Sequence, residues 1–166
     1  MTYASRHGST AEVAEAIATV LGEQGHRTDL RAARGVAGLG AYDAVVLGGA
    51  LYMGRLHADA RHFLVRHRDE LARMPVAVFA MGPTDLEERH VAEARGELDR
   101  ALHHVPEVRP LAVTVFGGVI DPAALHFPLN RMKPADARDW DAIRGWAAGL
   151  AAGLRDAGVA GHHAGS

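Results

Sequence analysis

Three apolar runs alternate with helical segments along the chain, and glycines stand at or near the end of each run. The runs are Tyr42 to Ala50, Val76 to Met81 and Leu111 to Phe116. Near-continuous apolar runs of this length are typical of strands buried on both faces of a parallel sheet. Strands that alternate with helices predict an α/β fold in which helices cover both faces of that sheet.

The segments between these runs have the periodicity of amphipathic helices. In the first, Val13, Ile17 and Leu21 share one face. Helices are predicted at 11–25, 57–74, 85–104 and 139–157, and a short edge strand is predicted at 27–32. The stretch 121–137 is expected to be irregular. We expect one domain, residues 1–157, followed by a disordered tail, residues 158–166.

Composition excludes several classes of function. The 166 residues include no cysteine, which rules out disulfides, thiolate catalysis and cysteine-ligated metals. Redox chemistry would therefore depend on a bound organic cofactor or on a metal with other ligands. A net charge of −2 without a basic, aromatic-rich stripe gives no indication of nucleic-acid binding. Because no membrane-spanning run or signal peptide is present, a cytoplasmic protein is expected.

The histidines and the large apolar side chains outside the runs have simple interpretations. His57, His62 and His67 recur every five residues and do not share a helix face, so no metal site is predicted. No loop holds an acid–base pair, so no catalytic residue is predicted either. Packing is the expected role of Trp140 and Trp146. For 127–129 two interpretations stand, contact with a membrane or porphyrin and packing onto the sheet, and the second is favoured.

The turn Ser5–Thr10 runs directly into the first predicted helix. A helix start has unpaired backbone N–H groups and a partial positive charge, so it attracts anions such as phosphate. Hydroxyls of Ser5, Ser9 and Thr10 and positive charge from Arg6 and His7 could assist. An alternative remains, because Ser9 and Glu12 also have the spacing of a capping box. The glycine fingerprints of dinucleotide-binding and P-loop proteins are absent.

Two further glycine-bearing segments follow predicted strands. They are Gly48–Gly54 and Met81–Thr84. Ligands of open parallel sheets bind at the carboxyl ends of the strands, where these segments and the Ser5–Thr10 turn should meet. The sequence therefore predicts a ligand site built from three loops.

The Ser5–Thr10 turn resembles the [ST]-x-T-G-x-T phosphate loop of flavodoxins. Gly8 and Thr10 match, Ser5 matches conservatively, and His7 replaces a hydroxyl residue. The second segment is similar to the flavodoxin loop that packs against the isoalloxazine ring. The longer patterns YDAVVLGGALYMGRLH, RHFLVRHRDELARMPVAVF, VFGG and RDWDAI, in this order, resemble a flavodoxin-like branch that includes the menaquinone-dependent protoporphyrinogen IX dehydrogenases.

This resemblance implies a flavodoxin-like three-layer sandwich with a five-stranded parallel sheet in the order 2-1-3-4-5. Its first strand would be short, because only Met1 to Ala4 precede the loop. The implied cofactor is FMN, bound by Ser5, Arg6, His7, Gly8, Ser9, Thr10, Ala50, Leu51, Tyr52, Met53, Gly54, Met81, Gly82, Pro83 and Thr84. Arg6 would either face solvent, which is favoured, or pair with the phosphate. His7 would either donate to the phosphate or cap the turn.

The function implied is that of an FMN-binding redox protein, an electron carrier or an oxidoreductase. A dehydrogenase acting on protoporphyrinogen IX with a quinone acceptor is the finer expectation, although 119–133 is shorter than the insertion associated with those enzymes. Expected partners are a redox partner or a quinone or porphyrin, with peripheral membrane contact left open. Positive charge at Arg55 and His57 should favour the anionic reduced flavin and raise its potential. The alternative is a flavin-free interaction module of the same fold.

Overall fold

A parallel sheet forms the centre of the molecule in the computed structural model, which describes residues 1–159. The strand order is β2-β1-β3-β5-β6, with bounds β2 (Arg31–Ala32), β1 (Thr2–Ala4), β3 (Val45–Tyr52), β5 (Val76–Met81) and β6 (Ala112–Phe116). The short β4 (Arg55–Leu56) pairs antiparallel with the end of β3. The predicted α/β class and the strand order 2-1-3-4-5 are therefore confirmed.

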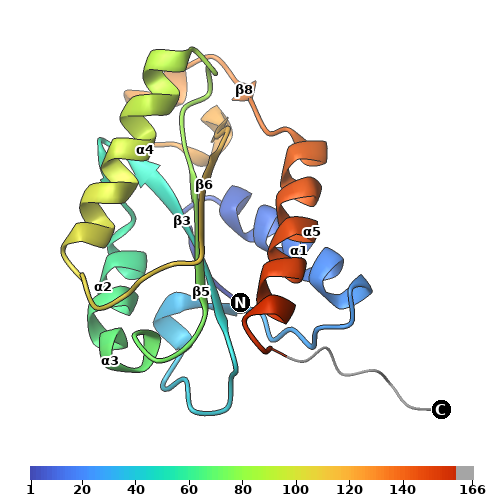
Figure 1. The fold of residues 1–166 in the computed structure, drawn as a ribbon. Helices are drawn as coiled ribbons and strands as arrows, with labels where there is room; N and C mark the ends of the chain where they lie inside the picture. The colour runs from blue at the N-terminus through green and yellow to red at the C-terminus, as the bar shows by residue number, and fades with distance from the viewer. Residues whose placement is uncertain (160–166) are drawn as a thin grey trace.

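Helices cover both faces of the sheet (Figure 1). The helices α1 (Ser9–Glu23) and α5 (Trp140–Asp156) lie on one face, and α2 (Ala58–Arg66), α3 (Arg68–Leu71) and α4 (Glu88–His103) lie on the other. The single helix predicted over 57–74 is wrong, because the chain leaves helical geometry at His67, with φ −104° and ψ 13°. The buried His67 ring lies 3.1 Å from the Glu70 carboxylate.

The interior strand β5 is apolar throughout because both of its faces are buried. Val76, Val78 and Ala80 belong to the core cluster under α2 and α4. The alternate residues Ala77, Phe79 and Met81 belong to the cluster under α1 and α5, as the two-residue period of a strand requires. The prediction of a fully buried third strand is wrong for β6, where residues 112–115 are only half-buried because β6 lies at the edge of the sheet.

The first strand, β1, is as short as expected, but it pairs with a neighbouring strand on each side. Thr2 and Ala4 are buried, and Thr2 pairs with both Arg31 of β2 and Leu47 of β3. Three residues therefore suffice to place the turn that follows β1 at the carboxyl edge of the sheet.

The two tryptophans pack as predicted. Trp146 meets Phe79 and Phe116 edge-on, with ring centroids 6.2 and 5.8 Å apart. Trp140 is partly buried against the same core cluster. Gly158 and Val159 close α5, since the Val159 N–H donates to the Leu154 carbonyl at 2.9 Å. The remainder of the predicted tail, with His162 and His163, lies outside the described residues.

Between β6 and α5 the chain makes an excursion, residues 119–136, which we call the arm. The stretch predicted to be irregular contains two short 3-10 turns and β8 (Ala135–Asp136), which pairs antiparallel with β7 (Val119–Ile120). The favoured packing of 127–129 onto the sheet is wrong, because Phe127 is 70% exposed. The Arg131 guanidinium lies over its ring, 5.0 Å from the centroid. Within residues 1–159, no helix is both long and apolar enough to cross a membrane.

Candidate functional site

The turn before α1 presents free backbone donors. Gly8 has a left-handed φ of 85°, and its N–H donates to Ser5 Oγ at 3.0 Å. The first helical hydrogen bond is donated by Glu12 N–H to the Gly8 carbonyl, at 3.0 Å. The N–H groups of residues 9–11 therefore precede the helical ladder and remain available to a ligand. The capping-box alternative is wrong, because Ser9 is already helical and no side chain caps α1.

Thr10 adds a second indication of a ligand at this turn. Its side chain is fully buried, and Oγ1 has no hydrogen-bond partner among the residues that the structure describes. A buried hydroxyl without a partner costs free energy, so such groups in native proteins usually meet water, an ion or a ligand. Arg6, His7 and Gly8 are exposed, which leaves the turn open to solvent.

The segment predicted as the second loop is a strand and a β-hairpin. β3 continues through Gly48 and Gly49 to Tyr52, and the chain reverses at Met53 and Gly54, whose φ angles are 51° and 75°. Two left-handed residues between paired strands are typical of a type I′ turn. The prediction of a loop over 48–54 is therefore wrong. The name hairpin tip is used below for residues 52–55.

The first turn and the hairpin tip meet at the carboxyl edge of the sheet. The exposed Arg6 guanidinium lies over the Tyr52 ring, 5.6 Å from its centroid. Arg6 is thus exposed and stacked on an aromatic ring, and its pairing with a phosphate stays a prediction. Met53 is 83% exposed beside it, so the tip presents apolar surface next to the anion-attracting turn.

The third predicted segment is only partly accessible. Met81 is buried and packs into the core under α1 and α5. The Gly82 N–H donates to the Phe116 carbonyl at 2.7 Å, and the Gly118 N–H donates to the Pro83 carbonyl at 2.8 Å. These bonds fix the path of residues 82–84, which are half-buried at the same edge as the other two segments.

A pocket of about 350 Å³ lies between the hairpin, this third segment and α4. Predicted residues that line it are Leu51, Gly54, Gly82, Pro83 and Thr84. Sequence reasoning missed its acidic wall, which is formed by Asp85, Glu93 and Glu97 together with His90. A local signal existed, since Asp85 directly follows Thr84 and His90 lies in the first turn of α4.

Asp85 and His90 form a close pair at the rim of this pocket. His90 Nδ1 lies 2.5 Å from Asp85 Oδ1, and Arg89 Nη2 lies 3.1 Å from His90 Nε2. The hydrogen bond to Asp85 raises the pKa of His90, and the same bond lowers the pKa of Asp85. Glu87 brings a third potential metal-ligand atom within 4.8 Å of theirs.

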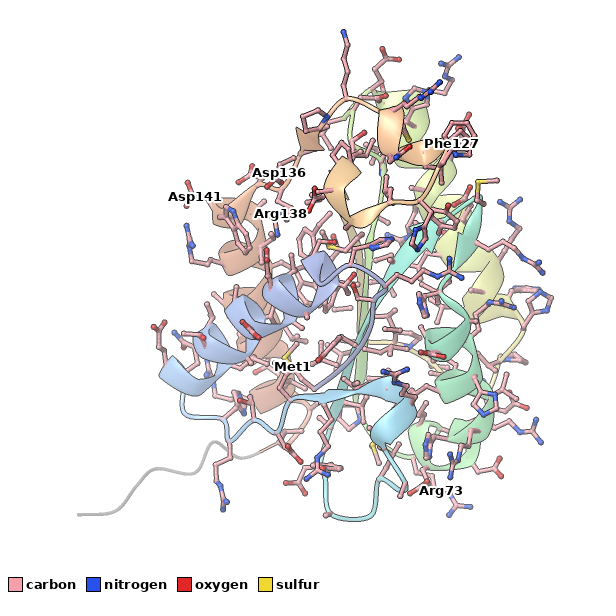
Figure 2. The ribbon with its side chains drawn as sticks, turned by 180° about the vertical axis from the view of Figure 1, so that it is seen from behind. Met1, Arg73, Phe127, Asp136, Arg138 and Asp141 are labelled. Carbon is pink, nitrogen blue, oxygen red and sulfur yellow. The ribbon has the colours of Figure 1, made fainter. Side chains whose placement is uncertain are left out.

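A second pocket, of about 470 Å³, separates the first turn from the arm. His7 and Ser9 line it on one side, and residues 119–121 and 134–136 line it on the other. Arg138, only 11% exposed, also lines it. Figure 2 shows Arg138 and Asp136 together above α1, with Phe127 on the opposite side of the arm. Arg138 is a further residue that sequence reasoning missed.

Comparison with protein families identifies the chain. The profile of the flavodoxin domain matches residues 1–132, which is most of the sequence. The chain belongs to the flavodoxin family. A search of curated proteins gave no significant match to this flavodoxin domain.

Several solved structures similar to this flavodoxin domain are flavodoxins. A flavodoxin from the domain Archaea has a TM-score of 0.58 at 14% identity, with 93% of this chain and 96% of that chain covered. Oxidised flavodoxin 1 from Bacillus cereus has a TM-score of 0.54 at 17% identity, covering 94% and 95%. A cysteine-to-alanine mutant of the Pseudomonas aeruginosa flavodoxin has a TM-score of 0.55 at 19% identity, covering 93% and 96%. At these identities the likeness supports the fold.

Proposed function

We propose that this flavodoxin domain binds FMN and transfers electrons through it. The observation that carries the proposal is the buried, unpartnered Thr10 hydroxyl at the start of α1. The phosphate of FMN can accept hydrogen bonds from this hydroxyl and from the free N–H groups of residues 9–11. The residues present therefore fit this phosphate. Ser5, which holds Gly8, keeps the turn in the shape that exposes these donors.

The isoalloxazine ring is assigned to the space beside the hairpin tip and residues 82–84. Tyr52 and Met53 offer flat or polarizable apolar surface there, and both are exposed. The family resemblance assigns the Met53–Gly54 peptide to hydrogen bonding with flavin N5. The flavin supplies the redox chemistry, while the chain binds it, covers it and sets the charge around it.

Within this proposal, a protoporphyrinogen dehydrogenase-like activity with a quinone acceptor is the finer candidate. It is supported by the ordered sequence patterns and by the exposed side chains of Phe127 and Met132 on the arm. Such side chains could contact a quinone, a porphyrin or a membrane surface. The coarser role, electron transfer to a redox partner, needs no apolar substrate.

The test is a titration of the purified protein with FMN and with riboflavin, in which binding is monitored by flavin fluorescence. The wild type should bind FMN more tightly than riboflavin. Thr10→Val should weaken FMN binding by about tenfold or more, because it removes a hydrogen bond to a charged group. Riboflavin binding should change little, and the apo variant should be at least as stable as the wild type.

A colourless protein that takes up no added FMN would overturn the proposal and favour the flavin-free interaction module. For a protein that does bind FMN, oxidation of protoporphyrinogen measured with and without a quinone separates the two finer roles. Quinone-dependent oxidation supports the dehydrogenase, and its absence leaves the electron carrier.

A further inference from the structure

Glu12 places a negative charge in the first turn of α1, close to the proposed phosphate site. Its carboxylate belongs to the same pocket as His7 and Ser9. The partial positive charge of a helix start favours a phosphate, and a nearby carboxylate opposes it. An FMN site at this turn therefore needs the charge of Glu12 to be compensated.

Arg138 provides that compensation from a distant part of the chain. Its Nη1 donates to Glu12 Oε2, 126 positions away in the sequence. Its Nε and Nη2 donate to the two carboxylate oxygens of Asp136, at 2.9 and 2.7 Å. The guanidinium also lies over the Trp140 ring, 4.9 Å from its centroid. Nε, Nη1 and Nη2 each donate one hydrogen bond to these two carboxylates, so the guanidinium is held beside Glu12, through which we expect it to act on a phosphate.

We propose that Arg138 is a positioning residue for the flavin phosphate, which raises the affinity for FMN by holding the Glu12 carboxylate and offsetting part of its charge, while it also pairs with Asp136. This inference rests on the proposed function, because it takes the FMN phosphate to lie at the start of α1. It predicts an effect on the phosphate that riboflavin, which lacks this group, does not share.

A purely structural role would have different consequences. Arg138 joins the end of the arm to α1, so its loss could loosen the arm and the pocket beneath it. Such loosening would affect FMN and riboflavin alike, and removal of the Glu12 charge would not reverse it. The two roles are therefore separated by the choice of ligand and by the second substitution.

The experiment measures dissociation constants of FMN and riboflavin for the full chain at low ionic strength. The variants are Arg138→Gln, Glu12→Gln, the double variant and Arg138→Lys. Arg144→Gln, which removes an exposed arginine paired with Asp141 on α5, is the matched control. Arg138→Gln should weaken FMN binding by about three- to tenfold, as expected for one uncompensated charge near a phosphate.

Glu12→Gln should strengthen FMN binding, and the double variant should return close to the wild type. Arg138→Lys keeps the charge but loses the paired hydrogen bonds to Asp136, so its FMN affinity should lie between those of the wild type and Arg138→Gln. Arg144→Gln should bind FMN nearly as the wild type does, and riboflavin should respond to none of the changes. The differences should shrink in high salt, because the charges are partly exposed to solvent. Should Arg138→Gln fail to fold, Glu12→Gln and Arg138→Lys still carry the test.

Equal effects on FMN and riboflavin, or no compensation by Glu12→Gln, would overturn the role of Arg138 and leave the FMN site standing. If the wild type binds no FMN, the binding of orthophosphate to the same proteins is measured by 31P NMR. Phosphate affinities in the predicted order would support Arg138 while the proposed function fails. No response to phosphate would overturn both.

Discussion

Gly48 and Gly49 lie inside β3, where a side chain would collide with a neighbour. A Cβ atom at Gly48 would lie 2.1 Å from Cζ of Phe79, and one at Gly49 would lie 2.7 Å from Cδ1 of Leu56. Both partners are buried core side chains. These glycines therefore allow the Phe79 ring and the hairpin to pack closely on β3, and they do not form a flexible loop.

Gly48→Ala should lower the free energy of unfolding by about 1–3 kcal/mol, because the Phe79 ring must move in a closely packed core. Chemical denaturation measures this change. Gly149→Ala is the matched control, since Gly149 is exposed in α5 with nothing within 4 Å of its Cβ position. It should stabilise by up to about 1 kcal/mol through helix propensity. A destabilisation of equal size in both variants would contradict the packing role.

The Asp85–His90 pair predicts a defined pH dependence. Because the pKa of His90 is raised and that of Asp85 is lowered, the pair stabilises the fold between these two values. Its contribution should be lost as the pH rises through the pKa of His90, and again as the pH falls through that of Asp85. NMR titration of the His90 ring should give a pKa above that of free histidine.

Asp85→Asn should lower the pKa of His90, because it removes the carboxylate that raises it. Asp99→Asn, which removes a carboxylate paired with Arg95 elsewhere on α4, should leave it unchanged. A His90 titration that does not respond to Asp85→Asn would show that the pair is not formed in solution.

Among the elements, the hairpin of β3 and β4 carries the clearest local strain. Met53 has a φ of 51° and no β-hydroxyl or amide to stabilise that conformation. A left-handed non-glycine residue costs about 1–2 kcal/mol, and less for asparagine. The turn is stable because Leu51 and Tyr52 pair with Leu56 and Arg55 on either side of it.

Met53→Asn should therefore raise the free energy of unfolding by about 1 kcal/mol, since Asn-Gly is a preferred pair for a type I′ turn. Thermal and urea unfolding measure the gain. Met53→Leu removes the sulfur and keeps the strain, so it should show no gain. Equal stability of the asparagine and leucine variants would contradict the strained turn.

The sequence predicts an element well when the interactions that form it are local in the chain, and poorly when they join residues that are far apart. Both bounds of strand β5 are predicted correctly, because the burial of both faces makes every residue of the strand apolar. The hairpin is missed because Met53-Gly54 is not a usual turn pair and the apolar run continues into it. The arm and the Glu12–Arg138 contact are missed because they join residues far apart in sequence, with no local pattern to mark them. The sequence thus locates the three segments that meet at the carboxyl edge of the sheet, and it misses the acidic wall of the pocket and the Glu12–Arg138 contact.

For the molecule as a whole, the positive charges near the proposed flavin lie on one edge. Arg6 stacks on Tyr52, and Arg55 pairs with Tyr52 across the hairpin. Arg73 lies at the opposite end of the molecule (Figure 2). Positive charge near the reduced flavin stabilises its anionic form, so Arg6 and Arg55 should raise the potential of the second electron step, while the acidic wall of Asp85, Glu93 and Glu97 opposes them.

Arg55→Glu should lower the midpoint potential of that step by about 20–40 mV, as Coulomb's law gives for a change of two charges near the ring in water. Spectroelectrochemistry of the FMN-bound protein measures it. Arg73→Glu makes the same charge change far from the edge and should leave the potential unaltered. Equal shifts in the two variants would mean that only net charge matters.

The ends of the arm are held together where they leave the sheet. The Ala137 N–H donates to the Gly118 carbonyl at 3.0 Å, and the backbone at Gly117 and Gly118 approaches residues 137 and 82 too closely for any Cβ. The cost of closing a loop grows only slowly with its length. Residues 122–133 lie between these two points and outside the β7–β8 pair and Asp136, so they should tolerate changes of length and sequence while the sheet keeps its register. This part of the arm is therefore a place at which a new recognition segment could be grafted next to the site.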